Sequence, residues 1–118
     1  MYLGEDISAD RTYQMAGVLP ASTKMTRKIQ ALGYVCGECL KDGIFRKGIR
    51  VSGHEFHYSR IECGRDAKFA FALSRGKGVK DGHDGLCEHN AVGGYTHVYF
   101  SPQFAQSIIA AANEYKRT

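Results

Sequence analysis

The chain has 118 residues, of which 43% are hydrophobic and 11% aromatic, a composition that suits one globular domain and excludes a disordered or fibrous chain. The net charge is +4, but the lysines and arginines are scattered, so nucleic-acid binding is weakly indicated and a solvated surface or an anionic substrate explains the charge equally well. No apolar run reaches the roughly 20 residues of a membrane span, and the N-terminus lacks the regions of a signal peptide, so a soluble, cytoplasmic protein is expected.

The first half of the chain predicts strands. Residues 13–20, YQMAGVLP, read as a short strand closed by Pro20, and residues 22–30, STKMTRKIQ, read as a polar connection. Residues 31–45, ALGYVCGECLKDGIF, carry β-branched and aromatic side chains and too many glycines for a helix. Residues 49–62, IRVSGHEFHYSRIE, alternate with a period of two, which is typical of a strand.

The second half predicts two further strands and a helix. AKFAFALSR at 67–75 is a strand candidate, and the turn-rich GKGVKDGHDG at 76–85 then reads as a hairpin loop. GGYTHVYF at 93–100 is the next strand. Ser101 as N-cap and Pro102 at the first helical position then predict a helix start. The apolar face of this helix is expected to contain Phe104, Ala105, Ile108, Ile109 and Ala112.

The stretch SGHEFHYS, Ser52 to Ser59, brings two histidines close to a glutamate. The zincin pattern needs two histidines four residues apart on a helix, and this spacing differs. On a strand, alternation sends His54 to one face and Glu55 and His57 to the other, so the histidines diverge and a shared metal ion is disfavoured. Glu55 and His57 suit a hydrogen-bonded polar cluster in a cleft; the alternative is a strand whose polar face meets solvent or a buried water.

The cysteines leave several interpretations open. In a cytoplasmic protein, Cys36, Cys39, Cys63 and Cys87 are expected to be reduced thiols. Cys36 and Cys39 form a CxxC pair, and the other two thiols would complete a set of four potential zinc ligands. Two features weaken the zinc hypothesis: the second pair is not a CxxC, and CGEC lies in a strand-like run. A thioredoxin-like redox role is weaker still, because no helix pattern follows Cys36 to lower its pKa.

Cys63 in ECGRD superficially suggests a nucleophile displayed on a turn between a strand and a helix. The residues that follow, AKFAFAL, alternate like a strand, whereas an activated thiol at such a turn needs the N-terminus of a helix. Cys63 is therefore a poor candidate for a catalytic nucleophile.

Four stretches taken together resemble a known family. MAGVLPASTKMTRKIQALGYV, GHEFHYSRI, ALSRGKGVKDGHDGL and GGYTHVYFSPQFA are similar, in order and spacing, to the glutamine amidotransferase domain of cobyrinic acid a,c-diamide synthases. In that family, a MYLG segment directly follows the turn that carries the nucleophilic cysteine. The resemblance implies that residues 1–118 are the C-terminal portion of a class I, flavodoxin-like α/β amidotransferase domain, here mostly β-strands with a C-terminal helix. The nucleophile region and the ATP-binding synthetase domain are then expected outside this chain, and Met1 to Leu3 are expected in the helix after the nucleophile.

The resemblance also implies roles for individual residues. His97 in GYTHVYF matches the histidine that carries protons for the cysteine thiolate, so it is the expected catalytic residue. The family often has a second histidine where this chain has Tyr99, so the resemblance carries no role of that second histidine over to this chain, whereas the match at His97 is unaffected. Glu55 and His57 match a Gly-x-Glu-x-His pattern, which implies substrate-binding positions that line the glutaminase pocket or its contact with the synthetase domain.

The implied function is part of a glutamine-dependent, ATP-driven amidoligase that amidates the a and c carboxylates of cobyrinic acid in cobalamin biosynthesis. Glutamine and a corrinoid are the expected substrates. ATP and Mg²⁺ are expected in the synthetase domain, and no cofactor or metal in this chain, because SRGKGVKDG lacks the GxxxxGK[ST] of a P-loop. By itself the chain is expected to be inactive, and to associate with its missing half or with itself. The alternatives are a nickel-sirohydrochlorin a,c-diamide synthase of methanogens and a non-catalytic binding module of the same fold.

Overall fold

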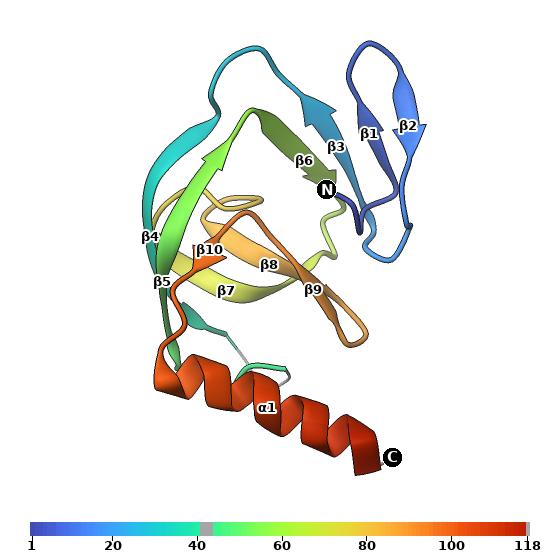
Figure 1. Ribbon diagram of the computed structural model, residues 1–118. Helices are drawn as coiled ribbons and strands as arrows, with labels where there is room; N and C mark the ends of the chain where they lie inside the picture. The colour runs from blue at the N-terminus through green and yellow to red at the C-terminus, as the bar shows by residue number, and fades with distance from the viewer. Residues whose placement is uncertain (41–43, 118) are drawn as a thin grey trace.

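The computed structural model describes residues 1–40 and 44–117 (Figure 1). Its elements are β1 (Asp6–Ser8), β2 (Thr12–Gln14), β3 (Ala21–Met25), β4 (Ala31–Cys39), β5 (Arg50–His57), β6 (Ser59–Cys63), β7 (Lys68–Arg75), β8 (His83–Glu88), β9 (Ala91–Gly93), β10 (His97–Val98) and α1 (Pro102–Arg117). The prediction of a mostly β chain with a C-terminal helix is confirmed. No helix within the described ranges is both long and apolar enough to cross a bilayer.

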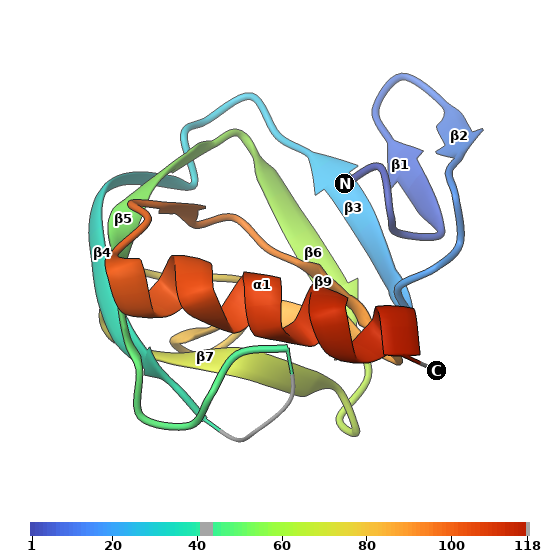
Figure 2. The same ribbon diagram turned by 60° about the horizontal axis from the view of Figure 1, so that its bottom comes forward.

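The strands of the described residues form two sheets. One sheet has the order β2-β1-β3-β6 and the other the order β10-β5-β4-β7-β8-β9. Strands β5 and β6 follow one another with Tyr58 alone between them, so this stretch leaves the larger sheet and enters the smaller one. Figure 1 shows the two sheets curving around a common interior, and Figure 2 shows α1 running across the end of the larger sheet.

Two clusters of buried side chains fill this interior. The first joins Cys39, Val51 and Phe71 of the larger sheet to Phe104 of α1, and the ring of Phe45 stacks on that of Phe104 with centroids 4.6 Å apart. The second contains Leu19, Ala21 and Leu86, which lie between the smaller sheet and β8. The larger sheet therefore buries one face and leaves the other to solvent, as the alternating burial along β5 indicates.

The helix begins as its sequence predicts. The Ser101 hydroxyl accepts a hydrogen bond from the backbone N–H of Phe104 at 3.1 Å, and Pro102 is the first helical residue. The predicted apolar face is wrong at Ile109, which is 60% exposed, and at Ala112, which is also exposed, while Ser107 is buried. Because α1 packs through Phe104 onto a small cluster of aromatic rings, it covers the sheet along a narrower stripe than its apolar residues suggest.

Several expectations for the chain's loops and strands are wrong. Residues 22–30 were expected as a connection but begin with β3, whose polar side chains are tolerated because β1 and β6 supply its hydrogen bonds on both sides. Residues 13–20 hold only the end of β2, and residues 93–100 hold only the end of β9 and the short strand β10, within mostly irregular backbone. The predicted hairpin loop at 76–85 is wrong from His83 onward, because β8 begins there and pairs with β7. Met1 to Leu3 form a turn closed by the Gly4 N–H and the Met1 carbonyl at 3.0 Å and not a helix, since so short a segment cannot offset the cost of helix nucleation.

Candidate functional site

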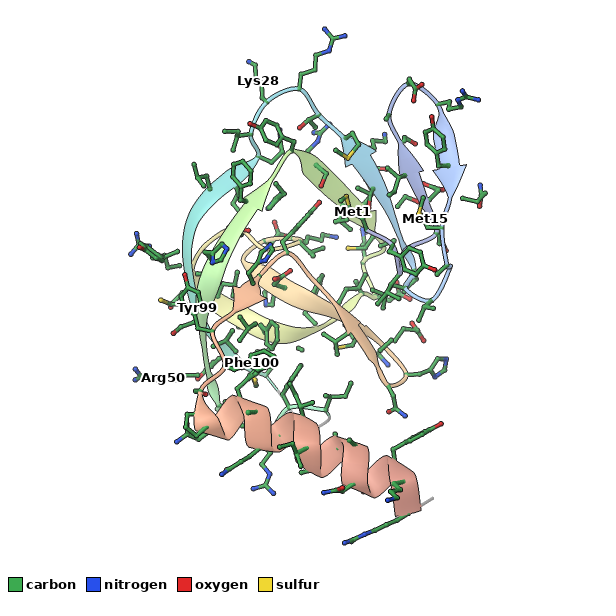
Figure 3. All side chains as sticks on the ribbon, in the orientation of Figure 1. Met1, Met15, Lys28, Arg50, Tyr99 and Phe100 are labelled. Atoms are coloured by element: carbon green, nitrogen blue, oxygen red, sulfur yellow. The ribbon has the colours of Figure 1, made fainter. Side chains whose placement is uncertain are left out.

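His97 lies on the exposed face of the larger sheet. In the antiparallel pair of β10 and β5 it stands opposite His54, and the two imidazole rings stack with centroids 4.8 Å apart. The Tyr99 hydroxyl lies 3.1 Å from Nδ1 of His54, and the centroids of the Tyr99 and His54 rings lie 5.7 Å apart, so this tyrosine contacts the ring pair. Figure 3 shows Tyr99 where β10 meets β5. The predicted catalytic histidine is thus exposed and held within an aromatic cluster, and its catalytic role stays a prediction.

A glycine makes this arrangement possible. Gly53 is buried on β5, and a Cβ atom built on it would lie 2.2 Å from the carbonyl oxygen of His97. The close approach allows Val98 to pair with Gly53 and Tyr99 to donate its N–H to the Ser52 carbonyl at 2.8 Å. The absence of a side chain at this position therefore sets how closely the strand that carries His97 docks on β5.

The variant Gly53→Ala is expected to separate β10 from β5 and to lower the free energy of unfolding by about 1–3 kcal/mol, because the added methyl overlaps backbone that cannot rotate away. The separation is measured by NMR, as the loss of nuclear Overhauser effects between ring protons of His54 and His97. Ser52→Ala, one residue away and exposed, should change neither quantity. Retention of the ring contacts in Gly53→Ala would show that Gly53 does not control the docking of β10.

Glu55 and His57 lie on the opposite face of β5, as alternation predicted. Glu55 is 3% exposed, and its carboxylate accepts hydrogen bonds from the N–H groups of Lys77 at 2.6 Å and Gly78 at 3.2 Å. Its Oε2 also lies 3.1 Å from Nε2 of His57. A buried carboxylate needs such donors to offset the loss of hydration, and here they come from the loop between β7 and β8. The predicted polar cluster is confirmed.

His57 extends this cluster toward Tyr95. Its Nδ1 lies 3.0 Å from the Ser59 carbonyl oxygen, and its ring stacks on that of Tyr95 with centroids 3.5 Å apart. Both ring nitrogens of His57 face acceptors, so the ring donates to both only in its protonated form. The Tyr95 hydroxyl in turn shares a 2.6 Å hydrogen bond with the Ser59 hydroxyl.

The environment of Tyr95 raises the pKa of its hydroxyl above the ordinary value of 10. Burial is the main cause that raises the pKa of Tyr95; the hydrogen bond from Ser59 lowers it in part, and the carboxylates of Asp84 and Glu55 raise it further. Tyr95 is two residues before His97, so the network of Glu55 and His57 contacts the segment that leads to the exposed histidine. Glu55 and His57 are thus linked to His97 through the backbone between Tyr95 and His97, whereas their side chains lie on the opposite face of the sheet from that of His97.

Asp84 is the residue that the sequence interpretation missed. It is fully buried, and its carboxylate accepts hydrogen bonds from the N–H of Tyr95 at 3.1 Å and from both the N–H, at 2.8 Å, and the hydroxyl of Thr96. These donors immediately precede His97. In the sequence Asp84 is one polar residue of the turn-rich stretch 76–85, and the pattern of that stretch indicates a loop and not a buried carboxylate.

The cysteines do not form an alternative site in the part of the chain that the structure describes. No group of three or more His, Cys, Asp or Glu side chains there could hold a metal ion, so the zinc hypothesis finds no support. Burial, with a smaller contribution from Glu38, raises the pKa of Cys39 from 9.0 to about 11, which opposes thiolate formation and redox chemistry. Cys63 ends β6, and no helix follows it directly, so it lacks the setting of an activated nucleophile.

Comparison with known proteins agrees with the motifs. A model of the CobB/CobQ-like glutamine amidotransferase domain matches residues 1–104. The cobyrinate a,c-diamide synthase of Halobacterium salinarum is 46% identical over 92 residues, covering 75% of this chain and 20% of that protein. Those of Archaeoglobus fulgidus and Methanocaldococcus jannaschii are 42% and 36% identical, covering 85% and 92% of this chain and 22% and 25% of theirs. The chain therefore spans about a fifth to a quarter of the length of these relatives.

Proposed function

Because the chain belongs to the CobB/CobQ-like glutamine amidotransferase domain family, we propose that it is the C-terminal portion of a class I, flavodoxin-like α/β glutaminase domain in a cobyrinate a,c-diamide synthase. In this proposal the whole enzyme transfers ammonia from glutamine to the a and c carboxylates of cobyrinic acid. The observation that carries the proposal is the family match across residues 1–104. It is supported by the exposure of His97, whose motif GYTHVYF resembles the segment of the family's proton-carrying histidine.

His97 is the proposed proton carrier. A cysteine thiolate attacks the side-chain amide carbon of glutamine, and a histidine beside it protonates the departing nitrogen, so that ammonia leaves and a thioester remains. The same histidine then takes a proton from the water that hydrolyses the thioester to glutamate. The family's MYLG segment follows the nucleophile turn, so the residues that match it, Met1 to Gly4, border the proposed position of the cysteine.

A cavity of about 180 Å³ supports this placement. It is lined on one side by the turn from Met1 to Gly4 and on another by Gly93, Gly94 and Tyr95, which lead to His97. The start of the described chain and the segment before His97 are therefore neighbours. A nucleophile turn joined to Met1 would enter the molecule beside Gly93, Gly94 and Tyr95, the segment that leads to β10.

ATP and Mg²⁺ are proposed to bind a synthetase domain outside this chain, where ATP would activate the carboxylates. The side chains of residues 1–40 and 44–117 do not fit a magnesium site, since they bring no three candidate ligands together. No step assigned to His97, Glu55 or His57 uses either group. Glu55 and His57 are proposed to hold the wall of a substrate pocket, through the loop at Lys77 and Gly78.

A chimeric enzyme tests the role of His97. If this chain replaces the matching region of the Archaeoglobus fulgidus relative, His97→Ala is expected to lower glutamine hydrolysis by at least about 100-fold, because the general acid and base is lost. Amidation with added ammonium salt should be retained, since that step needs no glutaminase. Ammonia release and product formation are both measured by coupled assay.

Two controls complete this experiment. His89→Ala removes another exposed histidine and should leave glutamine hydrolysis unchanged. The 118-residue chain without the chimera should release no ammonia above a blank without protein. Hydrolysis by the lone chain that His97→Ala abolishes, or full glutaminase activity of the His97→Ala chimera, would contradict the proposal.

A further inference from the structure

A second cleft, of about 410 Å³, lies on the face of β5 opposite His97. Its floor contains His57, Ser59 and Tyr95, and its sides include Arg60 of β6 and Lys77 and Lys80 of the loop between β7 and β8. The chemistry proposed for His97 does not use these three cationic side chains.

The loop that carries Lys77 and Lys80 is held in a defined shape. Gly76 and Gly78 have positive φ angles of 112° and 66°, which L side chains rarely adopt. The buried carboxylate of Glu55 accepts the N–H groups of Lys77 and Gly78, so it anchors the loop from below. Because these N–H groups are already bonded, a ligand in the cleft must be recognised by side chains.

The floor of the cleft has a spare hydrogen-bond donor. The hydroxyls of Ser59 and Tyr95 share one hydrogen bond of 2.6 Å, and either can be its donor. Two hydroxyls carry two protons, so one O–H of the pair is left to donate elsewhere. Both ring nitrogens of His57 are occupied by Glu55 and the Ser59 carbonyl. The floor therefore offers a neutral donor beneath a cationic rim.

The charge of this rim is not balanced by the residues around it. Arg60, Lys77 and Lys80 line the cleft together with one carboxylate, Asp81, and within residues 1–40 and 44–117 none of the three makes a salt bridge. Glu55 below the floor is itself paired with His57 and the loop amides. An anion entering the cleft would thus meet an excess of positive charge in a partly enclosed space.

We propose that this cleft binds the carboxylate group of a small organic acid. The carboxylate oxygens accept hydrogen bonds from Arg60 and the two lysines, and one oxygen also accepts the spare O–H of the Ser59–Tyr95 pair. The dimensions suit a molecule of about the size of an amino acid or a short dicarboxylic acid. The inference rests on the proposed function in one respect, namely that this domain handles carboxylate substrates. Its test does not depend on that function, because binding to the cleft is measured without any reaction.

An NMR titration of the ¹⁵N-labelled chain tests the proposal. Glutarate, a five-carbon diacid, is expected to shift the amide signals of Lys77, Gly78, Lys80 and Tyr95 and to saturate in the millimolar range. Its neutral diamide should leave them unshifted. Arg60→Gln and Lys80→Gln should each weaken glutarate binding by about two- to fivefold, as expected for one exposed ion pair. Lys116→Gln, in the last turn of α1, is the matched control and should bind as the unmodified chain does.

Several results would overturn the proposal. These are the absence of saturable shifts, equal shifts with the diamide, equal or tighter binding of inorganic phosphate, and unchanged affinity in both charge variants. Dispersed spectra of each variant establish that it is folded. Glutarate binding by the free chain combined with full glutaminase activity of the His97→Ala chimera would refute the role of His97 and leave the carboxylate site standing. Loss of glutaminase activity in that variant without glutarate binding by the free chain would refute only the site.

Discussion

Replacement of Asp84 by alanine is expected to lower the free energy of unfolding by about 3–5 kcal/mol, a large part of the stability of a small domain. The carboxylate is fully buried and accepts hydrogen bonds from the N–H of Tyr95 and from the N–H and hydroxyl of Thr96. Alanine leaves these donors without an acceptor, and each unsatisfied buried donor costs about 1–3 kcal/mol. Urea unfolding followed by circular dichroism measures the change.

Two further variants identify the cause of this loss. Asp84→Asn keeps one acceptor oxygen and should lose about half as much stability as the alanine variant. Asp10→Ala removes an exposed carboxylate that accepts from Tyr13 and Arg11, and it should lose less than about 1 kcal/mol. A loss below that value in Asp84→Ala would mean that the hydrogen bonds from residues 95 and 96 do not hold the segment before His97.

The chain is expected to self-associate in solution through the exposed face of β4, β5 and β10. Leu32 and Phe56 stand opposite each other there and are 69% and 50% exposed, and Tyr34 and Tyr99 are 62% and 51% exposed. Large apolar groups gathered on one sheet face mark an interaction surface, because burying them releases ordered water. Phe56→Lys should weaken association by about tenfold or more, since it introduces a charge at the centre of this face.

Sedimentation velocity over a range of protein concentrations measures this association. Ile109→Lys is the control, because Ile109 is a comparably exposed apolar residue on α1. It should leave the association constant unchanged. A chain that stays monomeric at high concentration and melts cooperatively would contradict the prediction, and would favour a stand-alone binding module over a portion of a larger domain.

Local patterns were sufficient for several elements. Ser101 and Pro102 marked the start of α1 because a helix cap is formed by residues three positions apart. The period of two along β5 placed Glu55 and His57 on the buried face and His54 on the exposed face, since strand geometry sends successive side chains to opposite sides. The motifs around His97 and Glu55 also identified the family.

Other features depended on neighbours distant in the sequence. The segment 22–30 looked like a connection, yet β1 and β6 pair on either side of its first residues, and Thr23, which is 1% exposed, faces the interior. Likewise, the helix face was wrong at Ile109 because the extent of the packing surface is set by Phe45 and Phe71 and not by the helix itself.

The sequence by itself determined the amidotransferase domain family, the start of the helix α1 and the alternation that places His54 and Glu55 on opposite faces of β5. Only the tertiary structure decided that Asp84 holds the two residues before His97, that His97 stacks on His54, and that Arg60, Lys77 and Lys80 line one cleft. The physical reason is the range of the interactions. Caps and strand alternation act within a few residues, whereas a buried carboxylate and a shared cleft exist only once strands far apart in the chain have paired.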